Sequence, residues 1–424
     1  MIHSLPVIFF KAKENDEKIL AWIFSLIIFV PTINYYLSFL LNANGFPTTT
    51  VPLYFGLYFF IILGYFFSVK KTLSPIVLLF IVLILYLLTF VFWPQNMEFM
   101  FGDKFDACYN PLYRIIFLGL PLAFIPFAIN DYFQFERPLV LLSILNNIVG
   151  IVAFWGVVIG KQQAFEYMTF AYNLLFSSCF LFVYSQMRKS KALFIISIFS
   201  LFTLTFIGAR GAMICALSFF VVYFFMKTQS SNIKKGLLFV FFFVVSILVY
   251  IYFNDMMGII AKIMNYIGFD SRIVSFLLSS NFVESHGREI LYDNLLNRVT
   301  ESPVFGYGIF GDRLLNRDFV RITGYAHNIF LELMVDFGIF GGVILSCVYL
   351  FACLFFLIKS KKNDFIFGLY VAIFSSSFIK LLVTGSYLTE QYFYLLVGGF
   401  VLVYRHCYLP TKGVMINENC SHCS

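Results

Sequence analysis

The sequence predicts an all-α, polytopic membrane protein with about twelve transmembrane helices. Of its 424 residues, 61% are hydrophobic and only 12% are charged, whereas soluble domains carry about a quarter charged residues. Apolar runs recur along the whole chain, so residues 1–424 are expected to form a single membrane domain. The net charge of +7 is typical of a membrane protein that keeps lysine and arginine on the cytoplasmic side. Nucleic acid is therefore not expected as a partner.

The apolar runs justify the individual helices. A helix needs about 20 mostly apolar residues to cross the hydrocarbon layer. The first run is too long for the apolar region of a signal peptide and lacks a small-residue cleavage site, so it is expected to stay as the first span. The expected spans are 19–41, 51–69, 74–93, 113–129, 138–159, 167–187, 192–208, 211–226, 236–253, 338–358, 364–384 and 391–405.

The short loops predict the orientation, because cytoplasmic loops are enriched in lysine and arginine. One alternate set of segments holds Lys11, Lys13, Lys18, Lys70, Lys71, Arg137, Arg188, Lys189, Lys191, Lys227, Lys234, Lys235, Lys359, Lys361, Lys362, Arg405 and Lys412. The opposite short loops hold only Lys104, Arg114, Lys161 and Arg210. Both termini are therefore expected in the cytoplasm, with residues 406–424 as a cytoplasmic tail.

One long segment, residues 254–324, is then expected outside. Short amphipathic helices at the membrane surface are expected in it, and Gly306-Tyr307-Gly308-Ile309-Phe310-Gly311 is expected to form a turn between two of them, since no strand precedes it as a dinucleotide site would require. The segment carries Lys262, Arg272, Arg288, Arg298, Arg313, Arg317 and Arg321. Arginine binds phosphate oxygens through a planar fork of donors, which suits a lipid diphosphate. The alternative is ion pairing within the segment, whose acids are Asp255, Asp270, Glu284, Glu289, Asp293, Glu301, Asp312 and Asp318.

His327 lies where this segment re-enters the membrane. An ionisable residue at that depth is a functional candidate, and histidine exchanges a proton near neutral pH. A structural role at the start of a helix is the alternative. Glu332 and Asp336 are more than about 100° away from His327 around an ideal helix, so they are expected to pair with arginines of the segment instead.

Three motifs resemble the O-antigen ligase and O-antigen polymerase superfamily, in the family's order. Gly208-Ala209-Arg210-Gly211 resembles its G-x-R-G turn between two spans. Gly287-Arg288 with Leu291-Tyr292, followed by Pro303, Gly306 and Gly308, resembles its loop segment, in which tryptophan often replaces Tyr292. His327-Asn328, nine residues and Gly338-Ile339-Phe340-Gly341 resemble its histidine signature.

The resemblance implies an activity. A glycan would pass from undecaprenyl diphosphate to a sugar hydroxyl, with inversion and without a metal or other cofactor. Matched residue by residue, it implies that Arg210, Arg288 and His327 are catalytic. The arginines would bind the diphosphate and stabilise its developing charge, and His327 would either accept the proton of the attacking hydroxyl or hold the diphosphate as an imidazolium.

Further residues are expected near the substrate. The substrate-binding set is Glu284, His286, Tyr292, Arg298, Arg313, Arg321 and Asn328. Tyr266, Tyr307 and Tyr325 are further candidates for stacking on sugar rings. Lys380, near the outer end of a span, is expected to extend to the membrane surface, and a position facing the substrate cavity is the alternative.

The resemblance leaves several functions open. We expect an O-antigen polymerase of the bacterial inner membrane, because the chain is 21% aromatic and carries no other motif. The alternatives are a ligase that transfers the glycan to lipid A core, a related protein glycosyltransferase, and a lipid-linked oligosaccharide flippase or transporter. The expected partners are undecaprenyl-diphosphate-linked oligosaccharides and the lipid bilayer, with a chain-length regulator as a further candidate.

Overall fold

The computed structural model describes residues 14–43, 50–101, 110–160, 167–207, 209–227, 288–320 and 324–408, with scattered residues between 240 and 262. Every regular element in these ranges is helical, which confirms the expected fold class. The elements are α1 (Glu14–Ala43), α2 (Thr50–Val69), α3 (Ser74–Phe92), η1 (Pro94–Asn96), α4 (Met97–Phe101), α5 (Pro111–Tyr113), η2 (Arg114–Gly119), α6 (Leu120–Ala128), η3 (Tyr132–Phe135), α7 (Glu136–Gly160), α8 (Tyr167–Arg188), α9 (Lys191–Ile207), α10 (Arg210–Lys227), α14 (Arg288–Glu301), α15 (Gly311–Val320), α16 (Ile329–Ser360), α17 (Asp364–Phe374), η4 (Ser375–Ile379), α18 (Lys380–Val383) and α19 (Gln391–Tyr408).

Eight helical segments of the described chain are long and apolar enough to cross a membrane, so the protein is a multi-pass membrane protein. They are Asn15–Leu41, Ser74–Phe92, Pro111–Ala128, Tyr132–Gly156, Met168–Arg188, Arg210–Lys227, Ile329–Ser360 and Asp364–Val383. The shorter apolar helices Gly56–Val69 and Lys191–Ile207 coincide with two further expected spans. The expected total of twelve is not confirmed. Span 236–253 lies largely outside the described residues, and span 391–405, in α19, is not among the candidate spans of the described chain.

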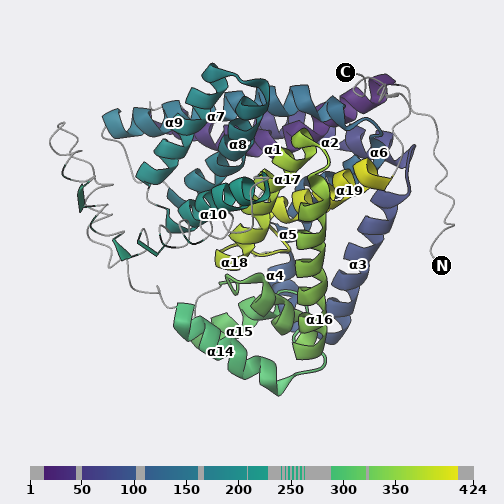
Figure 1. Cartoon of the computed structure of the whole chain (residues 1–424). Coiled ribbons are helices and arrows are strands. Elements are labelled where there is room, and N and C mark those ends of the chain that lie inside the picture. The colour runs from purple at the N-terminus through teal and green to yellow at the C-terminus, as the bar shows by residue number, and fades with distance from the viewer. Residues whose placement is uncertain are drawn as a thin grey trace, which may run out of the picture.

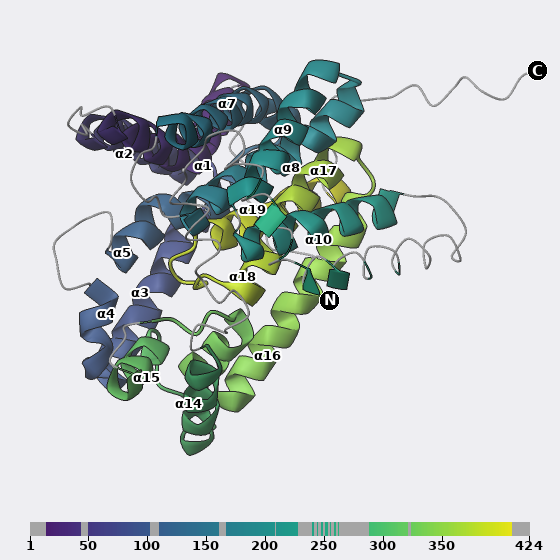
Figure 2. The same cartoon turned by 90° about the vertical axis from the view of Figure 1, so that its left-hand side faces the viewer.

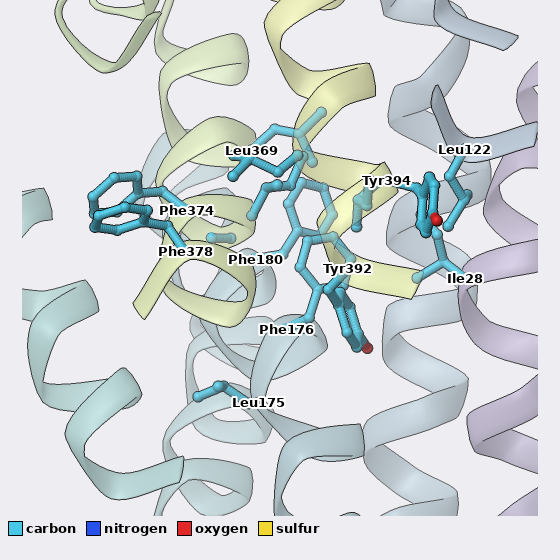
Figure 3. Packing of buried hydrophobic residues seen from close by; sticks show 14 of the residues in the cluster. Ile28, Leu122, Leu175, Phe176, Phe180, Leu369, Phe374, Phe378, Tyr392 and Tyr394 are labelled. Carbon is cyan, nitrogen blue, oxygen red and sulfur yellow. The ribbon is translucent and has the colours of Figure 1, made fainter. Parts of the chain in front are cut away.

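The hydrophobic core lies where α1, α6, α8, α17 and α19 meet (Figure 3). Phe176 and Phe180 of α8 contact the rings of Tyr392 and Phe365, with centroids 5.9 and 6.3 Å apart. In the spans that contain α8 and α17, 78% and 83% of the most apolar window is buried, against 17% in α3 and α16. The helices α3 and α16 therefore present most of their apolar surface outward, as lipid-facing helices do.

The loops gather at two opposite ends of the helix bundle. At one end, the Glu17 carboxylate accepts hydrogen bonds from the backbone N–H groups of Asn130 and Asp131, at 3.1 Å each, and Arg405 donates to the Asn130 side chain. Glu136 and Arg188 form an ion pair between α7 and α8. Arg188 and Arg405 both belong to the set expected in the cytoplasm, and the assignment of this end to the cytoplasm stays a prediction.

The helices α14 and α15 lie together at the other end, beside the ends of α3 and α16 (Figures 1 and 2). They confirm the short helices expected in the long segment. A small second core fixes them against α16: Leu295 and Val299 of α14 pack with Ala326, Leu331 and Val335. We call the part formed by α14, α15 and residues 302–310, 324–328 and 384–390 the loop end.

Candidate functional site

The helix α16 breaks its regular geometry at the loop end. Gly338 has φ 75° and ψ 171°, which kinks the helix. The carbonyl oxygens of Val335 and Asp336 accept hydrogen bonds from the backbone N–H groups of Tyr307 and Gly308, at 2.8 and 3.1 Å. The residues between α14 and α15 therefore form the turn expected for the glycine-rich sequence, and this turn satisfies carbonyl groups beside the kink.

The glycines of the turn and of the kink approach each other closely. Gly306 has a φ of 65°, and a Cβ added there would lie 2.5 Å from the Val335 carbonyl oxygen. A Cβ on Gly338 would lie 2.7 Å from the carbonyl oxygens of Pro303 and Val304. Side chains do not fit at such distances, so glycine is required at both positions. The glycines of the P-x-x-G-x-G motif therefore contact the GxxG motif, and this contact holds the loop end against α16.

A buried network of charged side chains lies beside the contact between the turn and α16. The Nη1 atom of Arg313 donates to Asp312 at 2.8 Å and lies 3.4 Å from Glu332. Burial alone would lower the pKa of Arg313, but the carboxylates of Asp312, Glu332 and Asp336 outweigh it and raise that pKa above its usual value. Glu332 pairs with an arginine of the long segment, as expected, whereas Asp336 accepts a hydrogen bond from the Tyr387 hydroxyl at 2.8 Å.

The same network positions the backbone on both sides of the site. The second oxygen of Asp312 accepts a hydrogen bond from the Ala326 N–H at 2.8 Å. Glu332 accepts from the Ser386 hydroxyl and from the Tyr387 N–H, the latter at 3.2 Å. Because Ala326 adjoins His327, these bonds hold the histidine and the segment before α19 in a fixed relation.

His327 is held in an uncommon conformation at the start of α16. Its φ is 55°, which few residues other than glycine adopt, and Asn328 caps the helix by accepting from the N–H of Phe330 at 3.0 Å. The imidazole ring lies against Tyr325, with centroids 4.1 Å apart. Its Nδ1 atom is buried and has no hydrogen-bond partner among the described residues. Burial and the charges of Arg288 and Arg313 lower the pKa of His327 to about 4.

Residues 382–384 bring the other parts of the site together. The first residue of α14, Arg288, donates from Nη1 to the Val383 carbonyl oxygen at 2.9 Å. A Cβ added to Gly211 would lie 3.6 Å from the Val383 side chain, so the start of α10, which carries Arg210, packs on the same residue. The Asn328 amide also reaches the Leu382 carbonyl oxygen, at 3.4 Å. The three motifs of the sequence therefore converge on one short segment, which consists of the end of α18 and Thr384.

A cavity of about 500 Å³ adjoins this segment. Tyr325, which contacts His327, and Thr384 form part of its wall, and they lie 3.2 Å apart between their hydroxyl oxygens. The cavity extends between α1, α8, η2 and the start of α19. Its size is within the usual range for small-molecule sites.

The other residues predicted to bind substrate have mainly structural contacts or lie outside the described ranges. Arg298 pairs with Glu301 at the surface, and the backbone carbonyl of Arg298 accepts from the Tyr307 hydroxyl at 2.9 Å. Tyr292 packs against the second core. Asn328 caps α16, and Arg313 belongs to the charge network. The residues outside the described ranges are Tyr266, Glu284, His286 and Arg321.

Lys380 has the alternative position given for it, facing the cavity, and the expectation that it extends to the membrane surface is wrong. The Lys380 side chain does not extend to the surface; it is buried, pairs with Glu390 at 2.6 Å and lines the cavity. Arg114 lines the same cavity, although it was counted only as an outer-loop charge. Both residues could have been recognised from the sequence, because Arg114 and Lys380 lie within apolar runs and charged residues there usually face a polar interior.

Comparisons with known proteins agree with this geometry. No curated protein matches the chain. Residues 195–346 match the family model described as O-antigen ligase, and this range contains Arg210, Arg288 and His327. The match does not separate a polymerase from a ligase, and it does not favour a flippase or transporter. Together with the three motifs, this match makes residues 195–346 similar to the O-antigen polymerase and ligase superfamily of membrane proteins.

Proposed function

We propose that this protein is an O-antigen polymerase that joins undecaprenyl-diphosphate-linked repeat units on the periplasmic side of the inner membrane. One observation carries the proposal: an imidazole nitrogen without a hydrogen-bond partner among the described residues is buried beside Arg288, at the segment on which the G-x-R-G turn also packs. An unsatisfied buried polar atom calls for an explanation. A substrate hydroxyl that donates its proton to this nitrogen supplies one.

The proposed reaction assigns a role to each group. The acceptor hydroxyl attacks the anomeric carbon of the lipid-linked glycan, a new glycosidic bond forms, and the bond from that carbon to the diphosphate breaks with inversion. The hydroxyl proton moves to Nδ1 of His327. Arg288 and Arg210 stabilise the negative charge that develops on the departing undecaprenyl diphosphate, so their guanidinium groups supply the positive charge that a metal ion supplies in other transferases.

The protonation state of His327 supports the proton acceptor over the phosphate-binding cation. With its pKa lowered to about 4, the free imidazole is neutral at neutral pH and can accept a proton. A bound diphosphate places negative charge beside the ring and raises this pKa again. The pKa therefore moves toward the working pH when the substrate is in place, which suits a general base.

A ligase is the second candidate, favoured by the description of the matching family model. The variant His327→Ala in a strain that depends on this protein tests both candidates. Loss of a polymerase leaves single repeat units on the lipid A core, and loss of a ligase leaves the core bare. We expect single repeats, with the protein still present in the membrane. His406→Gln, at the opposite end of α19, is the control and should leave long chains. Long chains in the His327→Ala strain would contradict the role of His327, and a bare core would assign the protein as a ligase.

The pH dependence of the reconstituted enzyme distinguishes the two roles of His327. The pH dependence of kcat/KM reports ionisations of the free enzyme. If His327 is a base with a pKa of about 4, its ionisation does not change kcat/KM between pH 5 and 7. We expect kcat/KM to fall only as the pH approaches about 4. The acid limb of kcat, which reports the complex, should lie at higher pH. An increase of kcat/KM as the pH falls from 7 to 5 would instead indicate an imidazolium that binds the diphosphate.

A further inference from the structure

The cavity beside His327 has an unusual lining for a membrane-embedded space. Six tyrosine rings contribute to it, from α1, α2, α5, α8, α19 and the loop end: Tyr35, Tyr58, Tyr113, Tyr172, Tyr325 and Tyr392. A tyrosine presents an apolar ring face together with a polar hydroxyl. A sugar ring offers the matching surface, apolar C–H groups on one face and hydroxyl groups at its edge. A lipid tail would match only the apolar part of this lining.

Two cations line the cavity, and each adjoins an irregular helical turn. Arg114 begins the wide π-helical turn η2, and Lys380 directly follows the π-helical turn η4. Such turns are rare and occur frequently at functional sites. Their occurrence at both cations indicates that the backbone is shaped to bring Arg114 and Lys380 to this space.

The charges of the lining do not cancel. Lys380 is paired with Glu390, and its ammonium lies 4.7 Å from the ring centre of Tyr172. The guanidinium of Arg114 makes no ion pair or hydrogen bond with the residues that the structure describes. A cation is costly at membrane depth without a compensating anion. Among the cavity-lining residues, Arg114 is thus the charge that a ligand anion would compensate.

A polar atom of the lining also lacks a partner. The Tyr172 hydroxyl is buried and makes no hydrogen bond with the described residues, and Tyr172 as a whole is only 5% exposed. Buried hydroxyl groups are normally hydrogen-bonded. A ligand hydroxyl in the cavity would satisfy this group while the neighbouring rings contact the sugar face.

We propose that this cavity is a saccharide subsite that binds an acidic sugar, with Arg114 paired to the carboxylate of the sugar and the tyrosines around the ring. The inference rests on the proposed function, because the cavity reaches His327 through Tyr325, and it adds a substrate class: repeat units that contain a uronic acid or a similar carboxylated sugar. Arg114 is then the residue that determines specificity for the charge of the sugar, and it takes no part in bond formation.

Binding of simple sugars to the full-length protein in lipid nanodiscs tests the inference. The probes are glucuronate and glucose, which differ in one carboxylate, and inorganic pyrophosphate. A charge-assisted hydrogen bond favours glucuronate over glucose by about tenfold or more in Kd. Arg114→Gln is expected to abolish this preference while glucose binding is retained, and Arg114→Lys is expected to keep much of it. Arg137→Gln, an exposed arginine of α7 outside the cavity, is the control and should behave as the wild type.

Two outcomes overturn the inference. Equal affinity of the wild type for glucuronate and glucose would show that the cavity does not select an acidic sugar. A loss of pyrophosphate affinity in Arg114→Gln, with the glucuronate preference unchanged, would assign Arg114 to the diphosphate instead. Thermal unfolding of each variant in detergent separates loss of binding from loss of folding. Because these measurements need no turnover, their failure is distinct from retention of long chains by His327→Ala, which would contradict the proposed function.

Discussion

Replacing Arg288 by lysine is expected to lower glycan transfer by about 10²- to 10³-fold, the loss typical when a donor to a developing oxyanion is removed. The charge is retained, so the expected loss arises from geometry. Arg288 uses one N–H group to bind the Val383 carbonyl oxygen, and its planar fork leaves further donors for phosphate oxygens. A lysine ammonium is a compact point charge without this planar fork, so it cannot bind the Val383 carbonyl oxygen and the phosphate oxygens with the same geometry. Single-turnover transfer by the reconstituted enzyme measures the effect.

The control for this prediction is Arg317→Lys. Arg317 also lies at the loop end, but it is paired with the exposed Glu98, and exposed ion pairs contribute little. We expect this variant to retain the rate of the wild type within about twofold. A normal rate in Arg288→Lys, with correctly folded protein, would show that the position requires only a positive charge. The role of the guanidinium fork would then be wrong.

Replacing Gly338 by alanine is expected to destabilise the loop end by about 3 kcal/mol or more. The backbone of Gly338, with φ 75° and ψ 171°, lies in a region that essentially only glycine adopts. The added Cβ would also lie 2.7 Å from the carbonyl oxygens of Pro303 and Val304. The turn between α14 and α15 must therefore move away from α16, and the hydrogen bonds from Tyr307 and Gly308 to α16 are lost. Thermal unfolding and protease cleavage within residues 302–310 measure the change.

Gly56→Ala is the matched control for the glycine substitution. A Cβ at Gly56 would meet nothing within 4 Å, and alanine has the higher helix propensity, so we expect no loss of stability. If Gly338→Ala unfolded at the same temperature as the wild type and resisted protease equally, the contact between the turn and the kink would not be what holds the loop end in place. Activity is a secondary readout here, because the substitution acts through the position of the site.

The motifs predicted from the sequence were informative about the site, but in part for a different reason than expected. The P-x-x-G-x-G and GxxG glycines resembled a family signature, and in the structure they form the contact between the loop end and α16. Asn328 was expected to bind substrate, and it caps α16. The sequence does not distinguish these roles, because a short polar side chain beside a histidine is compatible with both.

The arginines show the same limit. Six of them in one segment indicated a diphosphate site, with ion pairing as the alternative. In the structure Arg298, Arg313 and Arg317 pair with carboxylates, whereas Arg288 binds a backbone carbonyl at the junction of the three motifs. Whether an arginine pairs with a carboxylate or lies at the site depends on which helix faces pack together. The composition of the segment carries no information about this packing.

The sequence by itself determined the class of this protein. Apolar runs long enough to cross a bilayer, few charges and an uneven distribution of lysine and arginine specify a multi-pass helical membrane protein. The tertiary structure decided what lies together. Arg210, Arg288 and His327 are separated by long stretches of chain. Only the packing of α10, α14 and α16 against the end of α18 and Thr384 brings their segments to one place. The cavity that contains Arg114 and Lys380 depends on the same packing. Helical periodicity fixes the face on which a residue lies, whereas long-range contacts between helices fix its neighbours.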